Sequence, residues 1–250
     1  MTNKRILFAG ESWATYGIHT KGASSYTTSG YEEGARDLLA ALKGAGFDVT
    51  YIRNHEAVEG FPYTTEEIAK NFDAVILSDI PADSLLLPHA VFVKGERRPN
   101  RLRSLAKFAE QGGGLLMIGG FMSFGGFEGR GRYAATPIAD ALPVVISHHD
   151  DRIEEPEGLN PVVAKDHPIL KGISGDWPYF LGYNRLKAKP TGEVILTAGN
   201  DPFLVVGQHG KGRVAAFASD CSPHWGSPEF MAWPHYSTFW AQLVGWLADS

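Results

Sequence analysis

Short apolar segments alternate with helical patterns through the first half of the chain. The apolar segments are residues 5–10, 47–52, 72–79 and 115–118, and polar or amphipathic stretches separate them. A succession of strand, helix and strand places the strands parallel in one sheet, with helices on its faces. The sequence therefore predicts an α/β fold with a mostly parallel sheet.

Capping residues mark the predicted helices. Residues 35–42 carry apolar side chains at helical spacing, and Ser29 is the predicted N-cap of this helix. Asn100 is expected to cap a later helix that ends before a run of three glycines. Thr136, followed by proline, is expected to cap a short one. Two stretches show no clear period and are expected to be irregular: residues 11–30 and 148–189.

The pattern changes towards the C-terminus. Residues 194–196, 203–206 and 214–218 are apolar runs joined by short, glycine-containing connections. Connections this short require antiparallel hairpins. A last apolar pattern at helical spacing, with Leu243 and Leu247, is expected to cover one face of the sheet. Because no repeat or linker interrupts the chain, we expect one domain over residues 1–250.

Composition and charge argue against several kinds of partner. The chain has 23 Lys and Arg against 28 Asp and Glu, a net charge of -5, and no basic block, so neither nucleic acid nor an anionic membrane is an expected partner. A single cysteine fits a reducing compartment, and no apolar run is long enough for a signal peptide or a membrane helix. We expect a cytoplasmic protein with a small-molecule ligand. A homo-oligomer is compatible with this composition.

Polar side chains gather at the predicted carboxyl ends of the strands. In an open α/β sheet ligands bind there, because loops and helix N-termini converge at that edge. Each of four strands is followed by groups suited to ligand binding. The predicted ligand-binding residues are Glu11, Ser12, Trp13, Asp79, Gly119, Gly120 and Trp225.

The single cysteine lies next to groups that could activate a thiol. His224 follows Cys221 by three residues and could accept its proton, while Asp220 could orient the histidine. These three residues are the catalytic candidates. The alternative is that Cys221 is a small buried hydrophobic residue, as free cysteines often are.

Two further motifs raise the question of bound ions. Residues 119–131 are rich in glycine and could place backbone N–H groups around an anion, but they match no nucleotide-binding signature, and close packing explains them equally. Residues 148–151 (HHDD) offer metal-ligand types. Because adjacent side chains of an extended segment point to opposite sides, a solvated loop is favoured over a metal site. We expect no metal and no other cofactor.

Several segments together resemble a known family. They include residues 10–22 (GESWATYGIHTKG), 112–120 (GGGLLMIGG) and 219–225 (SDCSPHW). Nearly end to end, the chain resembles a family of bacterial cytoplasmic proteins that are class I glutamine amidotransferase-like and related to trehalose-utilisation-type proteins. The resemblance implies a flavodoxin-like three-layer sandwich, with a mostly parallel sheet and antiparallel C-terminal hairpins.

The same resemblance implies where catalysis would occur. Working relatives carry a nucleophilic cysteine on a sharp turn after a central strand, which here is the segment 115–118. The turn that follows, residues 119–122 (GGFM), holds no cysteine. His167 precedes Pro168 as in such folds, but Ile169 stands where a glutamate would complete the motif. Standard release of ammonia from glutamine is therefore not expected.

Three functions compete. The first is binding of a small polar metabolite, for example a carbohydrate derivative, at the carboxyl ends of the strands. The second is a hydrolase or amidotransferase variant with Cys221 as nucleophile, His224 as base and the amides of residues 119–120 as oxyanion donors. The third is a non-catalytic assembly or partner-binding protein that uses exposed aromatic surfaces.

Overall fold

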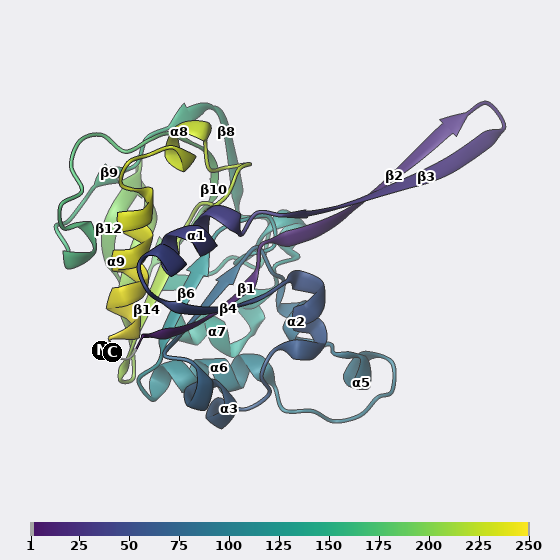
Figure 1. The fold of residues 1–250 in the computed structure, drawn as a ribbon, viewed down its shortest axis with the longest axis horizontal. Coiled ribbons are helices and arrows are strands. Elements are labelled where there is room, and N and C mark those ends of the chain that lie inside the picture. The colour runs from purple at the N-terminus through teal and green to yellow at the C-terminus, as the bar shows by residue number, and fades with distance from the viewer. Residues whose placement is uncertain (1–2, 250) are drawn as a thin grey trace.

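A computed structural model describes residues 3–249 and is built around an eight-stranded sheet (Figure 1). The strand order is β4-β1-β5-β6-β14-β13-β12-β9. The first five strands in this order, from β4 through β1, β5 and β6 to β14, run parallel. The remaining pairs, β14 with β13, β13 with β12 and β12 with β9, are antiparallel. The bounds are β1 (Arg5–Gly10), β4 (Asp48–Ile52), β5 (Ala74–Ser78), β6 (Gly114–Ile118), β9 (Val162–Val163), β12 (Glu193–Ala198), β13 (Asp201–His209) and β14 (Gly212–Phe217).

The topology is flavodoxin-like. In chain order, the five parallel strands lie in the sheet as 2-1-3-4-5, which is the flavodoxin arrangement. The predicted α/β class, with a parallel sheet and antiparallel C-terminal hairpins, is therefore confirmed. Each of β5 and β6 is buried along its whole length, which explains why these strands appear as unbroken apolar runs rather than as alternating ones.

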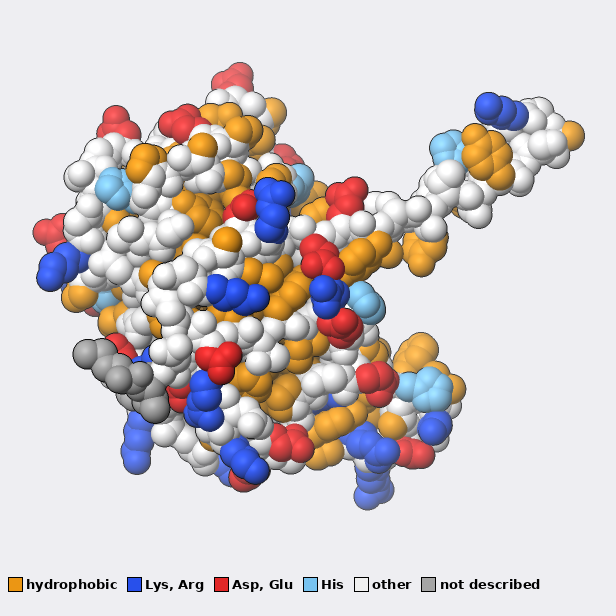
Figure 2. Space-filling model, viewed as in Figure 1, with side chains coloured by type: hydrophobic (Ala, Val, Ile, Leu, Met, Phe, Trp, Pro, Cys, Tyr) orange, Lys and Arg blue, Asp and Glu red, His pale blue; other side chains and the backbone are white. Residues whose placement is uncertain are grey.

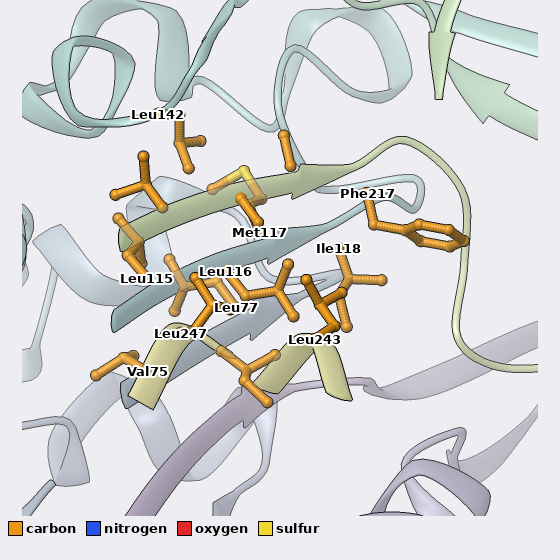
Figure 3. Packing of buried hydrophobic residues seen from close by; sticks show 14 of the residues in the cluster. Val75, Leu77, Leu115, Leu116, Met117, Ile118, Leu142, Phe217, Leu243 and Leu247 are labelled. Atoms are coloured by element: carbon orange, nitrogen blue, oxygen red, sulfur yellow. The ribbon is translucent and has the colours of Figure 1, made fainter. Parts of the chain in front are cut away.

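Helices cover both faces of this sheet. Helix α9 packs on α1 and on β5, β6 and β14, while α6 packs on β6, β14, α3 and α7. Figure 3 shows Leu142 on one side of the strands and Leu243 and Leu247 of α9 on the other. The helices are α1 (Arg36–Gly44), α2 (Asn54–Gly60), α3 (Thr65–Asn71), α4 (Ala82–Leu86), α5 (His89–Phe92), α6 (Arg101–Glu110), α7 (Pro137–Ala141), α8 (Pro228–Met231) and α9 (Tyr236–Ala248), with 3-10 turns at Phe127–Gly129, Tyr133–Ala135 and Pro168–Leu170.

Two of the three predicted caps are correct. Asn100 accepts a hydrogen bond from the N–H of Arg103 at 2.9 Å, and the Thr136 side chain accepts one from Ile138. The predicted cap at Ser29 is wrong: this residue lies within a strand, and α1 begins only after Ala35, which has no side-chain cap. None of the helices in the described part of the chain has the length and apolar character needed to span a membrane.

Residues 11–30 are not the irregular stretch that we expected. They contain most of a two-stranded antiparallel hairpin formed by β2 (Ser12–Lys21) and β3 (Ser24–Glu33), which extends away from the body (Figures 1 and 2). Almost every side chain of the hairpin is exposed. Most residues of this stretch are polar or glycine, which favoured a loop over a strand.

Residues 148–189 are likewise more regular than predicted. β8 (Arg152–Leu159) and β10 (Phe180–Asn184) form a second small antiparallel sheet, and β7 (Val144–Val145) pairs with β11 (Lys187–Ala188). Pro156 and Gly158 lie within β8, and both residue types are depleted in strands. Their presence explains why the sequence pattern favoured a loop.

Candidate functional site

A pocket opens where the strand order reverses. From β1 the chain connects to β4 on one side and later to β5 on the other, so the loops after β1 and β5 diverge and leave a crevice. The loops after β6 and β14 complete its walls. The pocket has a volume of about 400 Å³ and is lined by Glu11, Trp13, Asp79, Phe121, Met122, Asp220, Ser222, Pro223 and His224.

The turn after β1 brings Glu11 to the base of this pocket. Gly10 has a φ of 113°, and a side chain there would collide with the carbonyl of Ser78, so β1 can end this close to β5 only with glycine. The N–H of Glu11 then donates to the Ser78 carbonyl oxygen at 2.8 Å. As a result the Glu11 side chain is buried, although it contributes to the pocket lining.

A hydrogen-bond network fixes the Glu11 carboxyl group. Ser78 Oγ donates to Oε2 at 2.5 Å, and Ser222 Oγ donates to Oε1 at 2.7 Å. Ser222 also contacts the neighbouring carboxylate, with its N–H 3.0 Å and its hydroxyl 3.1 Å from Asp220 Oδ1. Two acidic groups thus share one serine in the floor of the pocket.

Three acidic side chains crowd together with no basic side chain in the pocket lining other than His224. Burial, and then the charge on Asp79, raises the pKa of Glu11 to about 7. Burial followed by the charges of Glu11 and Asp79 raises the pKa of Asp220 well above its usual value. Burial also raises the pKa of Asp79, although the N–H of Met122 donates to its Oδ1 at 2.6 Å. This floor therefore favours bound protons, ligand hydroxyl groups or a cation.

Backbone strain is concentrated at the same place. Six non-glycine residues in the described chain have positive φ, and three of them line the pocket: Glu11 (52°), Asp79 (43°) and His224 (128°). Such conformations cost about 1–3 kcal/mol each and persist where the surrounding structure enforces them, commonly at functional sites. The strained residues include two of the three carboxyl groups.

The rim of the pocket is aromatic and apolar. Trp13 is half-buried at the root of β2, and Phe121 and Met122 follow the β6 strand. The ring of His224 lies 4.7 Å from that of Phe121, in an edge arrangement. Acidic groups at the base and flat rings at the rim suit a ligand that carries hydroxyl groups and an apolar face.

Cys221 lies beneath the pocket rather than in its lining. Its side chain is fully buried, and its Sγ lies 3.7 Å from both Ser78 Oγ and Glu11 Oε2. No hydrogen bond joins Cys221 and His224, whose side chain is exposed on the rim. Burial and the nearby charges of Glu11 and Asp220 raise the pKa of the Cys221 thiol well above its usual value. This environment disfavours the thiolate that a nucleophile requires.

The burial of Cys221 makes a direct prediction. Iodoacetamide at pH 8 should leave the folded protein unmodified over hours and should alkylate Cys221 completely after unfolding in guanidinium, because the reaction needs an accessible thiolate. Mass spectrometry of the intact protein measures both. Rapid modification in the folded state would restore Cys221 as a catalytic candidate.

The predicted ligand-binding residues divide into two groups. Glu11, Trp13 and Asp79 line the pocket, together with two of the catalytic candidates, Asp220 and His224. The others lie outside the lining. The hydroxyl of Ser12 accepts the N–H of Asn54 at 2.9 Å, and the fully buried Trp225 donates its Nε1–H to Glu154 at 2.9 Å.

Neither Gly119 nor Gly120 has a free amide to offer as an oxyanion donor. The N–H of Gly119 donates to the Phe217 carbonyl at 2.8 Å, and that of Gly120 donates to Asn184 Oδ1 at 3.0 Å. Four further residues of the pocket lining were not predicted from the sequence, although they adjoin predicted ones: Phe121, Met122, Ser222 and Pro223.

The glycine-rich loop does surround an anion, but that anion belongs to the protein. Asp151, nearly fully buried, accepts the N–H groups of Gly125 and Gly126 at 2.9 Å each and the side-chain amide of Asn184 at 2.8 Å. Asp150 instead forms an ion pair with Arg152 at 2.9 Å. The two aspartates of the HHDD segment therefore have structural contacts: Asp151 binds the glycine-rich loop, and Asp150 binds Arg152.

A different group has suitable metal-ligand atoms. In residues 3–249, one cluster of histidine, cysteine or acidic side chains could hold an ion: Glu11, Asp220 and Cys221, whose ligand atoms lie within 4.8 Å of one another. The sequence analysis did not identify this cluster. All three groups are held in hydrogen bonds, and the thiol favours its protonated form.

Comparisons with known proteins agree with this architecture. Two solved structures of cytoplasmic proteins from Salmonella typhimurium, the second from strain LT2, superpose with a TM-score of 0.93 each, at 42% and 44% identity. Each covers 97% of this chain, which in turn covers 98% and 99% of theirs. A ThuA-like protein from Bacteroides uniformis shares the fold at 12% identity, with a TM-score of 0.59 and coverage of 99% and 93%. No match was found among curated proteins.

The match to a family model extends over residues 5–249, almost the whole chain. The chain therefore belongs to the class I glutamine amidotransferase-like family (GATase1_like), which carries the description "Putative glutamine amidotransferase".

Proposed function

We propose that this protein binds a small polyhydroxylated metabolite, of carbohydrate-derived chemistry, in the pocket between β1 and β5. The observation that carries the proposal is the pairing of an acidic floor with an aromatic rim at the switch point of the sheet. Carboxyl groups accept hydrogen bonds from sugar hydroxyls, and the face of Trp13 can stack on the apolar face of a sugar ring. The pocket volume of about 400 Å³ lies in the range of small-molecule sites and suits a small metabolite.

Alternative ligand classes fit this pocket less well. Anionic ligands such as nucleotides would meet the three carboxyl groups of Glu11, Asp79 and Asp220 and no lysine or arginine in the lining. Glutamine hydrolysis needs a thiolate on the turn after β6, where residues 119–122 have none. The two Salmonella relatives are described as cytoplasmic proteins, and we propose the same compartment here.

Thermal-shift screening tests this proposal. Sugars, polyols, sugar acids, amino acids and nucleotides are compared, and a sugar or polyol should raise the melting temperature because it binds only the folded state. Trp13→Ala should weaken binding about tenfold through loss of stacking. Trp246→Ala, at a tryptophan outside the pocket lining, is the matched control and should keep the wild-type shift.

Two results would contradict the proposal. The first is that no sugar or polyol raises the melting temperature while a ligand of another class does. The second is a sugar or polyol that raises the melting temperature of Trp13→Ala as much as that of wild type, since the ligand would then occupy another site.

Zn²⁺ and Mn²⁺ are included in the screen as separate ligands because Glu11, Asp220 and Cys221 have suitable donor atoms.

A second candidate function is acid–base catalysis by Glu11 on the bound metabolite. A pKa near 7 suits a group that both gives and takes a proton at neutral pH, and Glu11 lines the pocket. Each ligand found in the screen is incubated with the protein and followed by proton NMR. Conversion that Glu11→Gln abolishes would support this function, and an unchanged ligand would leave binding alone as the activity.

A further inference from the structure

The β2–β3 hairpin is an arm that contacts the body at its base and leaves almost all of its remaining surface exposed. Each strand has ten residues, so at about 3.3 Å per residue the arm is about 33 Å long. All of its residues are exposed apart from Ser12, Trp13 and Gly17. An isolated two-stranded hairpin is only marginally stable in water. An arm of this length therefore needs a surface to pack against.

One face of the arm is uncharged and contains large apolar side chains. Residues that pair across the two strands share a face, so Ala14, Tyr16, Ile18 and Thr20 lie beside their partners on β3, which are tyrosine, serine and threonine. Tyr16 is 79% exposed and Ile18 is 78% exposed. Large apolar side chains this exposed on a projecting element are typical of an interface.

The charge of the arm argues against a nucleic acid or membrane partner. Residues 14–31 hold one formal charge, on Lys21, although 20% of the whole chain is charged. Figure 2 shows the arm surface as mostly white and orange. A ribbon that binds phosphate groups would need several basic residues. Depletion of charge is instead a property of protein–protein interface cores.

We propose that the arm packs on a second copy of this chain in a homo-oligomer with exchanged arms. A partner that the arm needs for its stability has to be present whenever the chain folds, and a second copy meets this condition; symmetric homo-oligomers are also the commonest assemblies. The arm has twenty strand residues, about half of which point to any one face, and a stable interface takes about 20–30 residues a side. Two exchanged arms therefore supply part of a standard interface, and the body of each copy has to supply the rest.

The body of the chain offers apolar surface for such an arm. Phe92, at the end of α5, is 73% exposed, and the adjacent Val93 is 64% exposed. In Figure 1 the arm and α5 both project from the same side of the body, so a second copy brought to that side would meet both.

The assembly also involves the pocket, because the arm begins and ends there. Trp13, at the root of β2, lines the pocket rim. Gly34, just after β3, donates its N–H to the Glu11 carbonyl at 2.9 Å, and a side chain at this position would crowd Glu11 Oε1 and Ser222 Oγ. Docking of the arm would thus hold the pocket rim and floor in place.

Sedimentation velocity over a concentration series tests the arm directly. Wild-type protein should sediment as a multiple of the 27.2 kDa chain, and Ile18→Glu should raise the dissociation constant at least about tenfold, towards the single-chain mass. Val162→Glu, at an exposed apolar residue of β9, is the matched control and should assemble as wild type does. These masses are read without ligand, so they are independent of the proposed function.

Hydrogen exchange adds a second readout. In the wild-type assembly the amides of residues 14–31 should be protected, and in Ile18→Glu they should exchange within seconds while the central sheet remains protected. A monomeric wild-type protein at all concentrations would overturn the proposal. An oligomer that Ile18→Glu leaves intact, or whose arm amides exchange freely, would overturn it as well, because another surface would then hold the copies together.

Discussion

Asp151→Ala is expected to lower the free energy of unfolding by about 3–5 kcal/mol. The substitution removes the acceptor of three buried donors, the N–H groups of Gly125 and Gly126 and the side-chain amide of Asn184. Each buried donor left without a partner costs about 1–3 kcal/mol. Urea denaturation followed by circular dichroism measures the difference from wild type. The loss should be large because the carboxylate holds the loop after β6 against β10.

The adjacent aspartate provides the matched control for this prediction. Asp150→Ala removes an ion pair with Arg152 and a hydrogen bond from the N–H of Glu128, both near the surface. An exposed ion pair contributes at most about 1 kcal/mol. Equal losses in the two variants would contradict the structural role of Asp151. Asp151→Asn should fall between the two, since its amide retains one acceptor oxygen.

The sheet could be predicted from the sequence because its strands are buried on both faces. Residues 74–78 and 114–118 are continuous apolar runs, and short glycine-containing turns identify the C-terminal hairpins. The arm was not predictable in the same way. Its two strands have almost no buried residue within the single chain, so its β-branched and aromatic residues are not part of a buried apolar run.

The pocket was predicted in part because the carboxyl ends of parallel strands share one edge. That rule selects Glu11, Asp79 and Asp220, all of which line the pocket, yet it says nothing of the direction in which each side chain points. Trp225 follows the same strand as Asp220, but its side chain is fully buried outside the pocket lining and donates its Nε1–H to Glu154. Partners this distant in the chain are visible only in three dimensions. The roles of these residues in binding stay predictions.

Glu11→Gln is expected to stabilise the protein at pH 8 and to have little effect near pH 4.5. The pKa of this carboxyl group is about 4.5 in an unfolded chain and about 7 in the folded one. Between these values the unfolded state releases its proton first, so the wild-type protein loses stability as the pH rises from 4.5 to 7 and stays at the lower level above 7. A shift of about 2.5 units corresponds to about 3 kcal/mol, which the neutral glutamine avoids.

Urea denaturation of chelator-treated protein between pH 4.5 and 8 checks this expectation. The exposed Glu157→Gln is the matched control and should follow the wild-type curve at every pH. If Glu11→Gln were destabilised equally across the range, the carboxylate would be ionised and stabilised by its two serine donors. If Glu11→Gln is instead more stable than wild type at pH 8 and equal to it near pH 4.5, the carboxyl group lowers the stability of the folded protein at neutral pH. Since a neutral residue of the same shape would then stabilise the fold more, this result would support a role of the Glu11 carboxyl group in the ligand binding that we propose.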